Sequence, residues 1–228
     1  LDNIPNWTYD GSSTGQSMSD NSEIILKPVA TFKNIIHPGE ITLILCDTYD
    51  NNNCPTPSNN RYNAVELFNK NKECVPWFGL EQEYFLMELT TNLPLGFIKA
   101  DKQGQYYCGV GVDNAFGREL VEEHAKLCLE YGIKLSGVNA EVAPGQWEFQ
   151  VGPCTGIDAG DHLWVARYLL YYLSEKHKIR INIEPKPVNG DWNGSGCHAN
   201  YSTKYMREGS GDKTGLYYIN NAIEKLSN

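Results

Sequence analysis

The stretch Pro76-Trp-Phe-Gly-Leu-Glu81-Gln-Glu83-Tyr-Phe-Leu-Met87 is the one around which the chain is organised. Aromatic and aliphatic residues run through it between a proline and a methionine, which is typical of a β-strand. Because successive side chains of a strand point to opposite faces, Glu81 and Glu83 share one face, about 6.6 Å apart along the strand. Two carboxylates aimed together repel each other unless a cation lies between them. The alternative is a solvated strand face.

Two further acids lie in Gly137-Val-Asn-Ala-Glu141-Val-Ala-Pro-Gly-Gln-Trp-Glu148-Phe-Gln-Val-Gly152. Apolar and polar residues alternate on both sides of Pro144-Gly145, which predicts a hairpin with this dipeptide as its turn. In that register Glu141 and Glu148 lie directly opposite each other, with β-carbons about 5 Å apart. Pro-Gly suits a type II turn rather than the primed turns of two-residue hairpins, so a longer loop with another register is the alternative.

Four acids on strand faces inside apolar sequence favour a metal site over a solvated surface. A histidine that could join them follows the glycine-rich segment Pro187-Val-Asn-Gly-Asp-Trp-Asn-Gly-Ser-Gly-Cys-His198. Glycines let the backbone approach a ligand closely, although such a segment is by default only a loop. Since the chain already has four candidate acids, we interpret His198 as a ligand or substrate contact.

Composition restricts the function that these residues can serve. The chain has 228 residues, a net charge of −9 and a sequence pI near 5.0, which argues against a nucleic-acid partner. No apolar run is long enough to cross a bilayer, so we expect no membrane partner. Seven cysteines without a CxxC pair are typical of reduced core thiols in a reducing compartment.

Periodicity predicts an α+β chain with strands over residues 23–28 and 40–46 and helices over residues 62–71, 113–131 and 161–176. Asp158 or Asp161 could cap the last helix. His124 falls on the apolar stripe of the second helix, so we expect it to be packed in the core. The polar, proline-bearing segment 50–61 predicts a domain boundary, with domains over residues 1–54 and 60–228. Asp10 begins an Asp-Gly-Ser-Ser turn and is structural by default.

Six motifs carry a family resemblance, from Trp7 to the end of the chain: WTYDGSST, PWFGLEQEY, YYCGVGVDNAFGRELVEEH, NAEVAPGQWEFQVGPC, GDHLWVARY and WNGSGCHANYSTK. The chain resembles the eukaryotic-type glutamine synthetases. The resemblance implies the later part of a β-grasp domain followed by part of a catalytic domain with a mainly antiparallel sheet and flanking helices. It also implies ATP-dependent ligation of ammonium to L-glutamate, through a γ-glutamyl phosphate intermediate, with Mg²⁺ or Mn²⁺.

By motif position, the resemblance also implies roles for single residues. Glu83, Glu141 and Glu148 would hold one metal ion, and Glu81 with His198 a second one on the nucleotide side. Glu141 and Asp10 would be catalytic, with Asp10 reaching the site of a neighbouring subunit to bind ammonium and take its proton. This implied role replaces the interpretation of Asp10 as a structural turn residue. It further implies a homo-oligomer with active sites at subunit interfaces.

The substrates would lie against two further sets of residues. The resemblance places glutamate against the loop residues Trp192, Asn193, Gly194 and His198. ATP would contact Glu81, Glu148, Phe149, Gln150, Val151, Gly152, Pro153, Asn200, Tyr201 and Ser202. The family's phosphate-clamping arginines, its flap glutamate and its last metal-ligand glutamate would follow Asn228, so we expect the 228-residue chain alone to be inactive.

Two alternatives to a glutamine synthetase remain. A related γ-glutamyl ligase would take an amine in place of ammonia, against which Asp10 and its ammonium pocket argue. A non-enzymatic structural or regulatory paralogue on the same fold would be expected to lose metal ligands, whereas all five assignable ligands are present. We expect a cytoplasmic protein, with organellar targeting as the alternative because any leader would precede Leu1.

Overall fold

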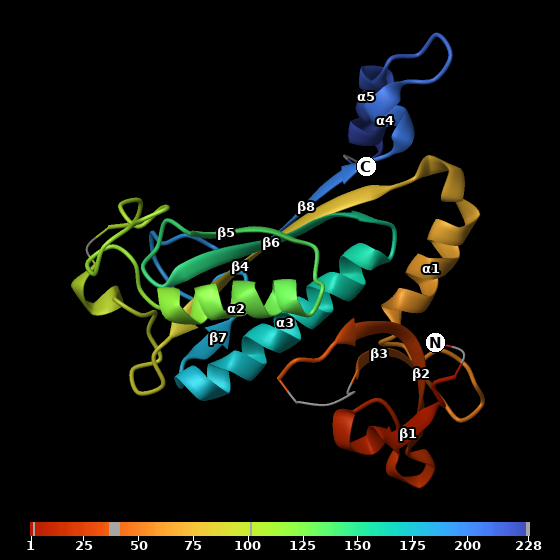
Figure 1. Cartoon of the computed structure of the whole chain (residues 1–228), viewed down its shortest axis with the longest axis horizontal. Coiled ribbons are helices and arrows are strands. Elements are labelled where there is room, and N and C mark those ends of the chain that lie inside the picture. Colours follow the sequence, from red (N-terminus) through yellow and green to blue (C-terminus); the bar gives the residue numbers. More distant parts are fainter. Residues whose placement is uncertain (2, 37–41, 101, 227–228) are drawn as a thin grey trace. The chain divides into compact units, whose positions relative to one another are not determined.

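The computed structural model describes residues 1, 3–36, 42–100 and 102–226 (Figure 1). It confirms the predicted α+β class, with helices beside antiparallel sheet. The chain divides into two compact units. The first comprises residues 1–77, 155–161 and 202–228, and the second comprises residues 78–154 and 162–201. The predicted domain boundary between residues 54 and 60 stays a prediction.

The first unit contains an antiparallel sheet in the order β1 (Trp7–Asp10), β2 (Glu23–Lys33), β3 (Thr42–Tyr49). The strand predicted over residues 23–28 continues beyond Pro28, because the pairing with β3 shifts register between Pro28 and Ala30. A proline cannot donate a ladder hydrogen bond and is tolerated at such a bulge. The strand predicted over residues 40–46 is described from Thr42, and Glu40 lies outside the described residues.

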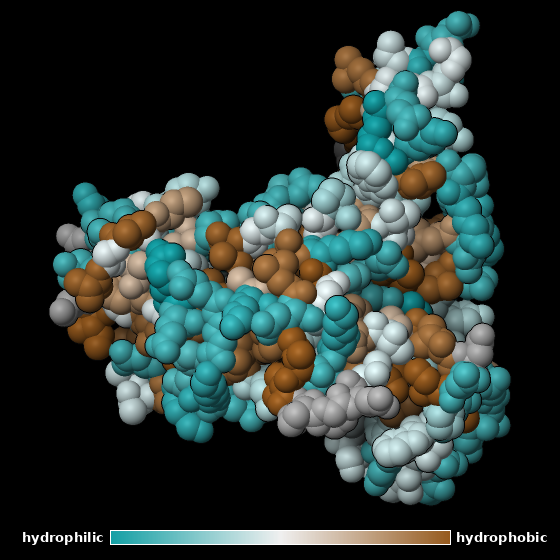
Figure 2. All heavy atoms as spheres, in the orientation of Figure 1, coloured by the Kyte–Doolittle hydropathy of each residue, from teal (hydrophilic) through white to brown (hydrophobic). Residues whose placement is uncertain are grey.

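Helices and short 3₁₀ turns complete the first unit. The helix predicted over residues 62–71 is α1 (Asn60–Lys70), which begins earlier because the Asn59 side chain accepts from the amide of Tyr62 at 3.1 Å. Near the end of the chain, α4 (Lys204–Glu208) packs against α5 (Gly215–Leu226). The 3₁₀ turns of this unit are Gly11–Thr14, Ser19–Asn21 and Lys72–Cys74. Figure 2 shows apolar side chains on the surface of α5, where Leu216 and Ile223 are exposed.

A buried ionic triad joins three elements of the first unit. Arg61 of α1 donates from Nε and Nη2 to the two carboxylate oxygens of Asp161, at 2.8 and 2.9 Å, and its Nη1 lies 3.6 Å from Asp47 of β3. Both acids are buried. Asp161 therefore does not cap the last helix as one alternative predicted: that helix, α3 (Asp158–His177), begins at Asp158, and Asp161 lies in its first turn, paired with Arg61.

We predict that Arg61→Met lowers the free energy of unfolding by about 3 kcal/mol, because removal of the shared cation leaves two buried carboxylates uncompensated. Urea unfolding at pH 7 measures this. The control is Lys126→Met, which removes the same charge from an exposed helical pair with Glu130 and costs at most about 0.5 kcal/mol. Equal effects of the two substitutions would contradict the structural role of the triad.

The second unit is built on a five-stranded sheet. Its order is β5 (Leu135–Ala140), β6 (Gln146–Thr155), β4 (Trp77–Met87) and β7 (Arg180–Asn182), and β8 (Cys197–Ser202) also pairs with β4. The strand predicted within the stretch Pro76–Met87 is confirmed and lies inside the sheet. Its carboxylates are thereby placed between β6 on one side and β8 on the other.

Helices α2 (Arg118–Glu130) and α3 lie side by side against this sheet (Figure 1). The helix predicted over residues 113–131 begins only at Arg118, because Gly117 has φ +82°, a left-handed conformation that does not continue a right-handed helix. The last predicted helix extends to both sides, over 158–177 rather than 161–176. One more 3₁₀ turn lies at Phe97–Lys99.

His124 of α2 is fully buried, as its place on the apolar stripe predicted. Its Nε2 lies 2.9 Å from the carbonyl oxygen of Ala166 in α3, and its ring packs edge-on against Phe149 of β6. Burial lowers the pKa of His124 to about 4. Between about pH 4 and pH 6.5, His124 is therefore neutral in the folded protein but protonated in the unfolded chain.

The unfolded chain binds a proton at His124 near pH 6.5, and the folded chain only near pH 4. Its contribution to stability is therefore complete above pH 6.5 and is lost as the pH falls toward 4. We predict that His124→Gln reduces the loss of unfolding free energy between pH 7 and pH 4 by roughly 3 kcal/mol. Denaturant titrations at both pH values measure this, and identical losses in variant and wild type would contradict it.

Candidate functional site

Two of the predicted ligands, Glu141 and Glu148, lie on one hairpin. Its loop is longer than the loop that would place them directly opposite each other. Asn139, not Glu141, pairs with Glu148, and the Glu141 amide donates to the Gln146 carbonyl at 2.9 Å. Pro144-Gly145 does form the turn, with Gly145 at φ +67°, but four residues connect the paired positions. The direct opposition was therefore wrong, and the alternative of a longer loop is confirmed. The two acids are diagonal neighbours on one face.

Three of the predicted metal ligands converge. Carboxylate oxygens of Glu83 from β4, Glu141 from the end of β5 and Glu148 from β6 all lie within 4.8 Å of one another. Glu141 and Glu148 are only 8% and 7% exposed. A shared strand face brings them together, since Glu148 faces Asn139 and Glu141 is two residues beyond it.

Neutral donors fix each carboxylate. The Gly196 amide donates to Glu83 Oε2 at 2.6 Å, and the Gln150 side chain donates to Glu148 Oε1 at 2.5 Å. Asn139 Nδ2 donates to Glu141 Oε1 at 3.1 Å. No lysine or arginine forms an ion pair with the three acids among the residues that the structure describes. Their negative charge is therefore oriented but not neutralised.

The electrostatics of the cluster suit a cation. Burial raises the pKa of Glu141, and the charge of Glu83 raises it further. Burial likewise raises the pKa of Glu148, with additional repulsion from Glu81 and Glu83. All-oxygen donors of this kind fit a hard divalent ion such as Mg²⁺ or Mn²⁺, which would stabilise the ionised carboxylates.

The other two predicted ligands lie close to each other but outside the three-carboxylate cluster. His198 Nδ1 of β8 is 3.5 Å from Glu81 Oε2 of β4, and the His198 side chain is 70% exposed. Asn200 Nδ2 donates to the second oxygen of Glu81 at 2.5 Å. Since Glu81 raises the pKa of Glu148 by charge repulsion, this second pair lies within electrostatic range of the first group.

A cavity of about 240 Å³ adjoins Glu81. Six of the residues that the resemblance assigned to ATP line it: Glu81, Gln150, Val151, Gly152, Pro153 and Asn200. Ser136 also lines it and was not predicted, since a serine on a strand carries no distinguishing sequence signal. Of the other assigned residues, Phe149 is fully buried in the core, and Tyr201 packs against Phe78 at 5.1 Å between ring centroids. Ser202 accepts from Arg207 at 2.9 Å.

The loop assigned to glutamate is held from several directions. Trp192 packs against Phe97, with ring centroids 4.7 Å apart. Gly194 lies where a β-carbon would meet the carbonyl oxygen of Pro185 at 2.9 Å, so no larger residue fits without a backbone shift. Gln146 contacts both Asn193 and Gly194. The loop therefore has a defined conformation beside the acidic cluster.

Asp10 forms the turn expected of its sequence. Its side chain accepts from the backbone amide and hydroxyl of Ser12, at 2.9 and 2.6 Å. These hydrogen bonds lower the pKa of Asp10 and keep it ionised. The residue is exposed. The catalytic role that the resemblance implies for Asp10 stays a prediction.

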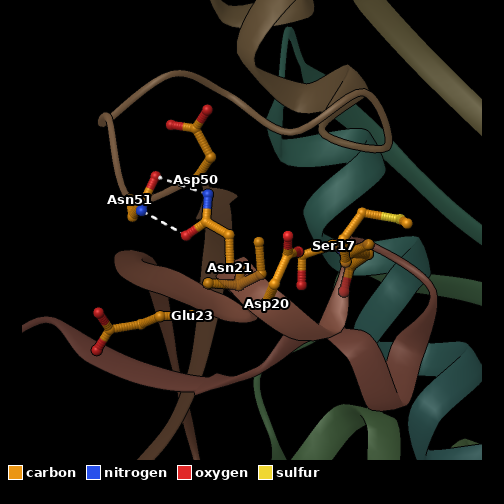
Figure 3. Close-up of a pocket in the computed structure, with 9 residues that line it drawn as sticks. Ser17, Asp20, Asn21, Glu23, Asp50 and Asn51 are labelled. Carbon is orange, nitrogen blue, oxygen red and sulfur yellow. Dashed lines mark hydrogen bonds between the residues drawn. The ribbon is translucent and has the colours of Figure 1, made fainter.

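Two further features were missed by the sequence analysis. A cavity of about 340 Å³ in the first unit is lined by Asp20, Glu23 and Asp50, and the side chains of Asn21 and Asn51 bond each other across it (Figure 3). In the second unit, the neighbouring Cys108 and then the charge of Glu141 raise the pKa of the exposed Tyr107. Tyr107 lies in a motif quoted for the resemblance, which was its only sequence signal.

Comparison with known proteins defines the family. The family model "Glutamine synthetase, catalytic domain" matches residues 58–210. A glutamine synthetase of Daucus carota named as chloroplastic is 52% identical over 98% of this chain and 52% of its own length. The cytosolic isozyme of the same plant is 50% identical over 98% of the chain and 64% of its length. A glutamine synthetase of Suillus bovinus is 49% identical over 97% and 62%. The chain belongs to the glutamine synthetase family.

The chain spans about half the length of several of the relatives that it matches. A solved structure of apo GmaS without ligand superposes with a TM-score of 0.71 over 90% of this chain and 50% of that chain, at 19% identity. At this identity the likeness concerns the fold alone. Among the described residues, no helix is long and apolar enough to span a membrane.

We predict that Gly152→Ala weakens nucleotide binding and lowers stability by about 1–3 kcal/mol. Gly152 has φ +131°, and a β-carbon there would lie 2.6 Å from the carbonyl oxygen of Phe78, beside the cavity. Thermal unfolding and titration with a fluorescent ATP analogue measure the two effects.

The control is Gly104→Ala, which imposes a similar strain at φ +105° but meets no atom within 4 Å. It should lower stability without changing nucleotide affinity. An unchanged affinity in Gly152→Ala would refute the assignment of the cavity.

Proposed function

We propose that the protein to which this chain belongs joins ammonia to L-glutamate with hydrolysis of ATP, giving L-glutamine, ADP and phosphate through γ-glutamyl phosphate. The single observation that supports this most strongly is the convergence of Glu83, Glu141 and Glu148 within 4.8 Å in the same compact unit as the cavity that Glu81 lines. Phosphoryl transfer needs concentrated positive charge beside a nucleotide, and this arrangement provides a place for it.

The proposed chemistry accounts for the residue types. The γ-carboxylate of glutamate is a poor electrophile, and its phosphorylation creates a leaving group. Ammonium must then lose a proton before it can attack, and a carboxylate both attracts the cation and accepts the proton. We assign both of these roles to Asp10, and we propose Glu141 as a second catalytic residue. Glutamate would be held by Trp192, Asn193, Gly194 and His198.

The carboxylates would hold divalent cations, Mg²⁺ or Mn²⁺. Glu83, Glu141 and Glu148 would bind one ion, and Glu81 with His198 a second one beside the nucleotide. When bound, such ions neutralise phosphate charge and orient the phosphoryl group. The residues themselves supply a fixed, partly buried oxygen cage whose hydrogen-bond donors leave lone pairs free for the ion.

Assembly and location follow from the same proposal. Asp10 would act in the active site of a neighbouring copy, so the working protein would be a homo-oligomer. All seven cysteines are free, which agrees with a reducing compartment, and we propose the cytoplasm. The relatives bear both chloroplastic and cytosolic names, so family membership by itself selects neither.

We predict that the 228-residue chain binds Mn²⁺ and that Glu148→Gln lowers this affinity roughly tenfold or more, because fewer ligand charges weaken binding of a hard cation. Isothermal titration measures it. The matched control is Glu122→Gln on the exposed face of α2, which removes the same charge and should leave Mn²⁺ binding unchanged. Equal affinities of wild type and Glu148→Gln would refute the proposed metal site.

A second experiment separates the ligation of ammonium from the ligation of an amine. We predict no ATP-dependent glutamine formation by the 228-residue chain alone, since the family's phosphate clamp would lie outside it. The same residues within a chain of the relatives' length should release phosphate with ammonium and L-glutamate. Release of phosphate with methylamine but not with ammonium would favour the amine ligase instead.

A further inference from the structure

The side chain of Gln146 connects the hairpin that carries Glu141 and Glu148 to the glycine-rich loop around Gly194. Gln146 begins β6, is 1% exposed and carries no charge. Its Nε2 donates to the carbonyl oxygen of Gly194 at 2.8 Å. Its Oε1 accepts longer hydrogen bonds from the Ala143 amide at 3.4 Å and from Asn193 Nδ2 at 3.5 Å. A buried amide that is bonded at both its nitrogen and its oxygen is costly to replace, because each lost bond leaves a buried polar group without its partner.

The backbone of the same residue closes the hairpin. The Glu141 amide donates to the Gln146 carbonyl at 2.9 Å, and the Gln146 amide donates to the carbonyl of Ala143 at 3.2 Å. These bonds define the loop of residues 142–145 and with it the position at which Glu141 leaves β5. Gln146 therefore holds the carboxylate hairpin with its backbone and the glycine-rich loop with its side chain.

The glycine-rich loop in turn reaches the third carboxylate. Two residues after Gly194, the Gly196 amide donates to Glu83 Oε2 at 2.6 Å. The Gly196 carbonyl is held separately by the side chain of Gln82 at 3.2 Å, and Gln82 is itself bonded by Arg167. Because only Ser195 separates Gly194 from Gly196, we expect displacement of Gly194 to shift the donor that orients Glu83. Among the described residues, the Gln146 side chain itself forms no hydrogen bond with Glu83.

We propose that Gln146 is a positioning residue that fixes the 193–196 loop against the carboxylate hairpin, and so sets both the metal-ligand geometry at Glu83 and the glutamate-contacting backbone at Gly194. This inference rests on the proposed function for its consequence in metal and substrate binding. The anchoring of the 193–196 loop by the side-chain amide of Gln146 rests on the hydrogen bonds alone. Partners that orient metal ligands from outside typically change metal affinity 10- to 100-fold when removed.

The test uses the 228-residue chain with Gln146→Met, which keeps the length of the side chain and removes its hydrogen bonds. Hydrogen exchange of peptides that cover residues 192–198 reports loop anchoring without any metal, and titration with Mn²⁺ reports ligand geometry. We expect faster exchange in this segment and a Mn²⁺ affinity about tenfold lower. Wild-type exchange together with wild-type affinity would overturn the proposal.

Two further variants keep the result interpretable. Gln146→Glu retains an oxygen toward Ala143 but loses the donor to Gly194, so it should also speed exchange in residues 192–198 even if Gln146→Met fails to fold. Asn59→Leu removes a different buried amide, in the first unit, that donates to the carbonyl of Thr48 at 3.0 Å. It should lower the melting temperature while leaving loop exchange and Mn²⁺ affinity unchanged.

Failure of this inference is distinguishable from failure of the proposed function. A wild-type chain that does not bind Mn²⁺, or whose binding is indifferent to Glu148→Gln, would overturn the proposed metal site while the exchange data still decide the anchoring role. A wild-type chain that binds Mn²⁺ through Glu148, combined with an inert Gln146→Met, would overturn only the role of Gln146.

Discussion

Repulsion among like charges is the constraint on which the second unit depends. Three carboxylates within 4.8 Å, two of them buried, are unfavourable unless something compensates them. The sheet holds them there because β4 lies between β6 and β8, and strands cannot slip by one residue without turning every side chain to the other face. The apolar faces of the same strands, covered by α2 and α3, supply the stabilisation that keeps this register.

Neutral groups rather than cations orient the acids. Backbone amides and the side chains of Asn139 and Gln150 donate to the carboxylates, and the cationic Arg167 bonds a glutamine, Gln82, instead of an acid. An arginine within the cluster would neutralise it and compete with a divalent ion. The first unit shows the opposite arrangement, since Arg61 there pairs with Asp47 and Asp161. One set of acids is thus used for stability and the other is kept available.

Much of the fold could be predicted because it depends on local pattern. The alternation around Glu81 and Glu83 identified β4, and the apolar stripe through His124 identified α2. The predictions from the sequence were wrong where a nonlocal partner or a special backbone conformation decides the local structure. Gly117 delays the start of α2, and Arg61, distant in sequence, takes Asp161 away from helix capping. The predicted register of the hairpin was wrong because four residues, 142–145, connect the paired positions instead of two.

The sequence by itself determined which residues bear charge, which strand faces they occupy, and through its motifs the family to which the chain belongs. The grouping of Glu83, Glu141 and Glu148 apart from Glu81 and His198 was implied by the motifs, but only the tertiary structure decided that Asn139 rather than Glu141 opposes Glu148, and that Gln146 holds the loop beside them. The physical reason is that alternation along a strand depends on neighbouring residues, whereas distances between strands depend on register, loop length and packing that no single segment encodes.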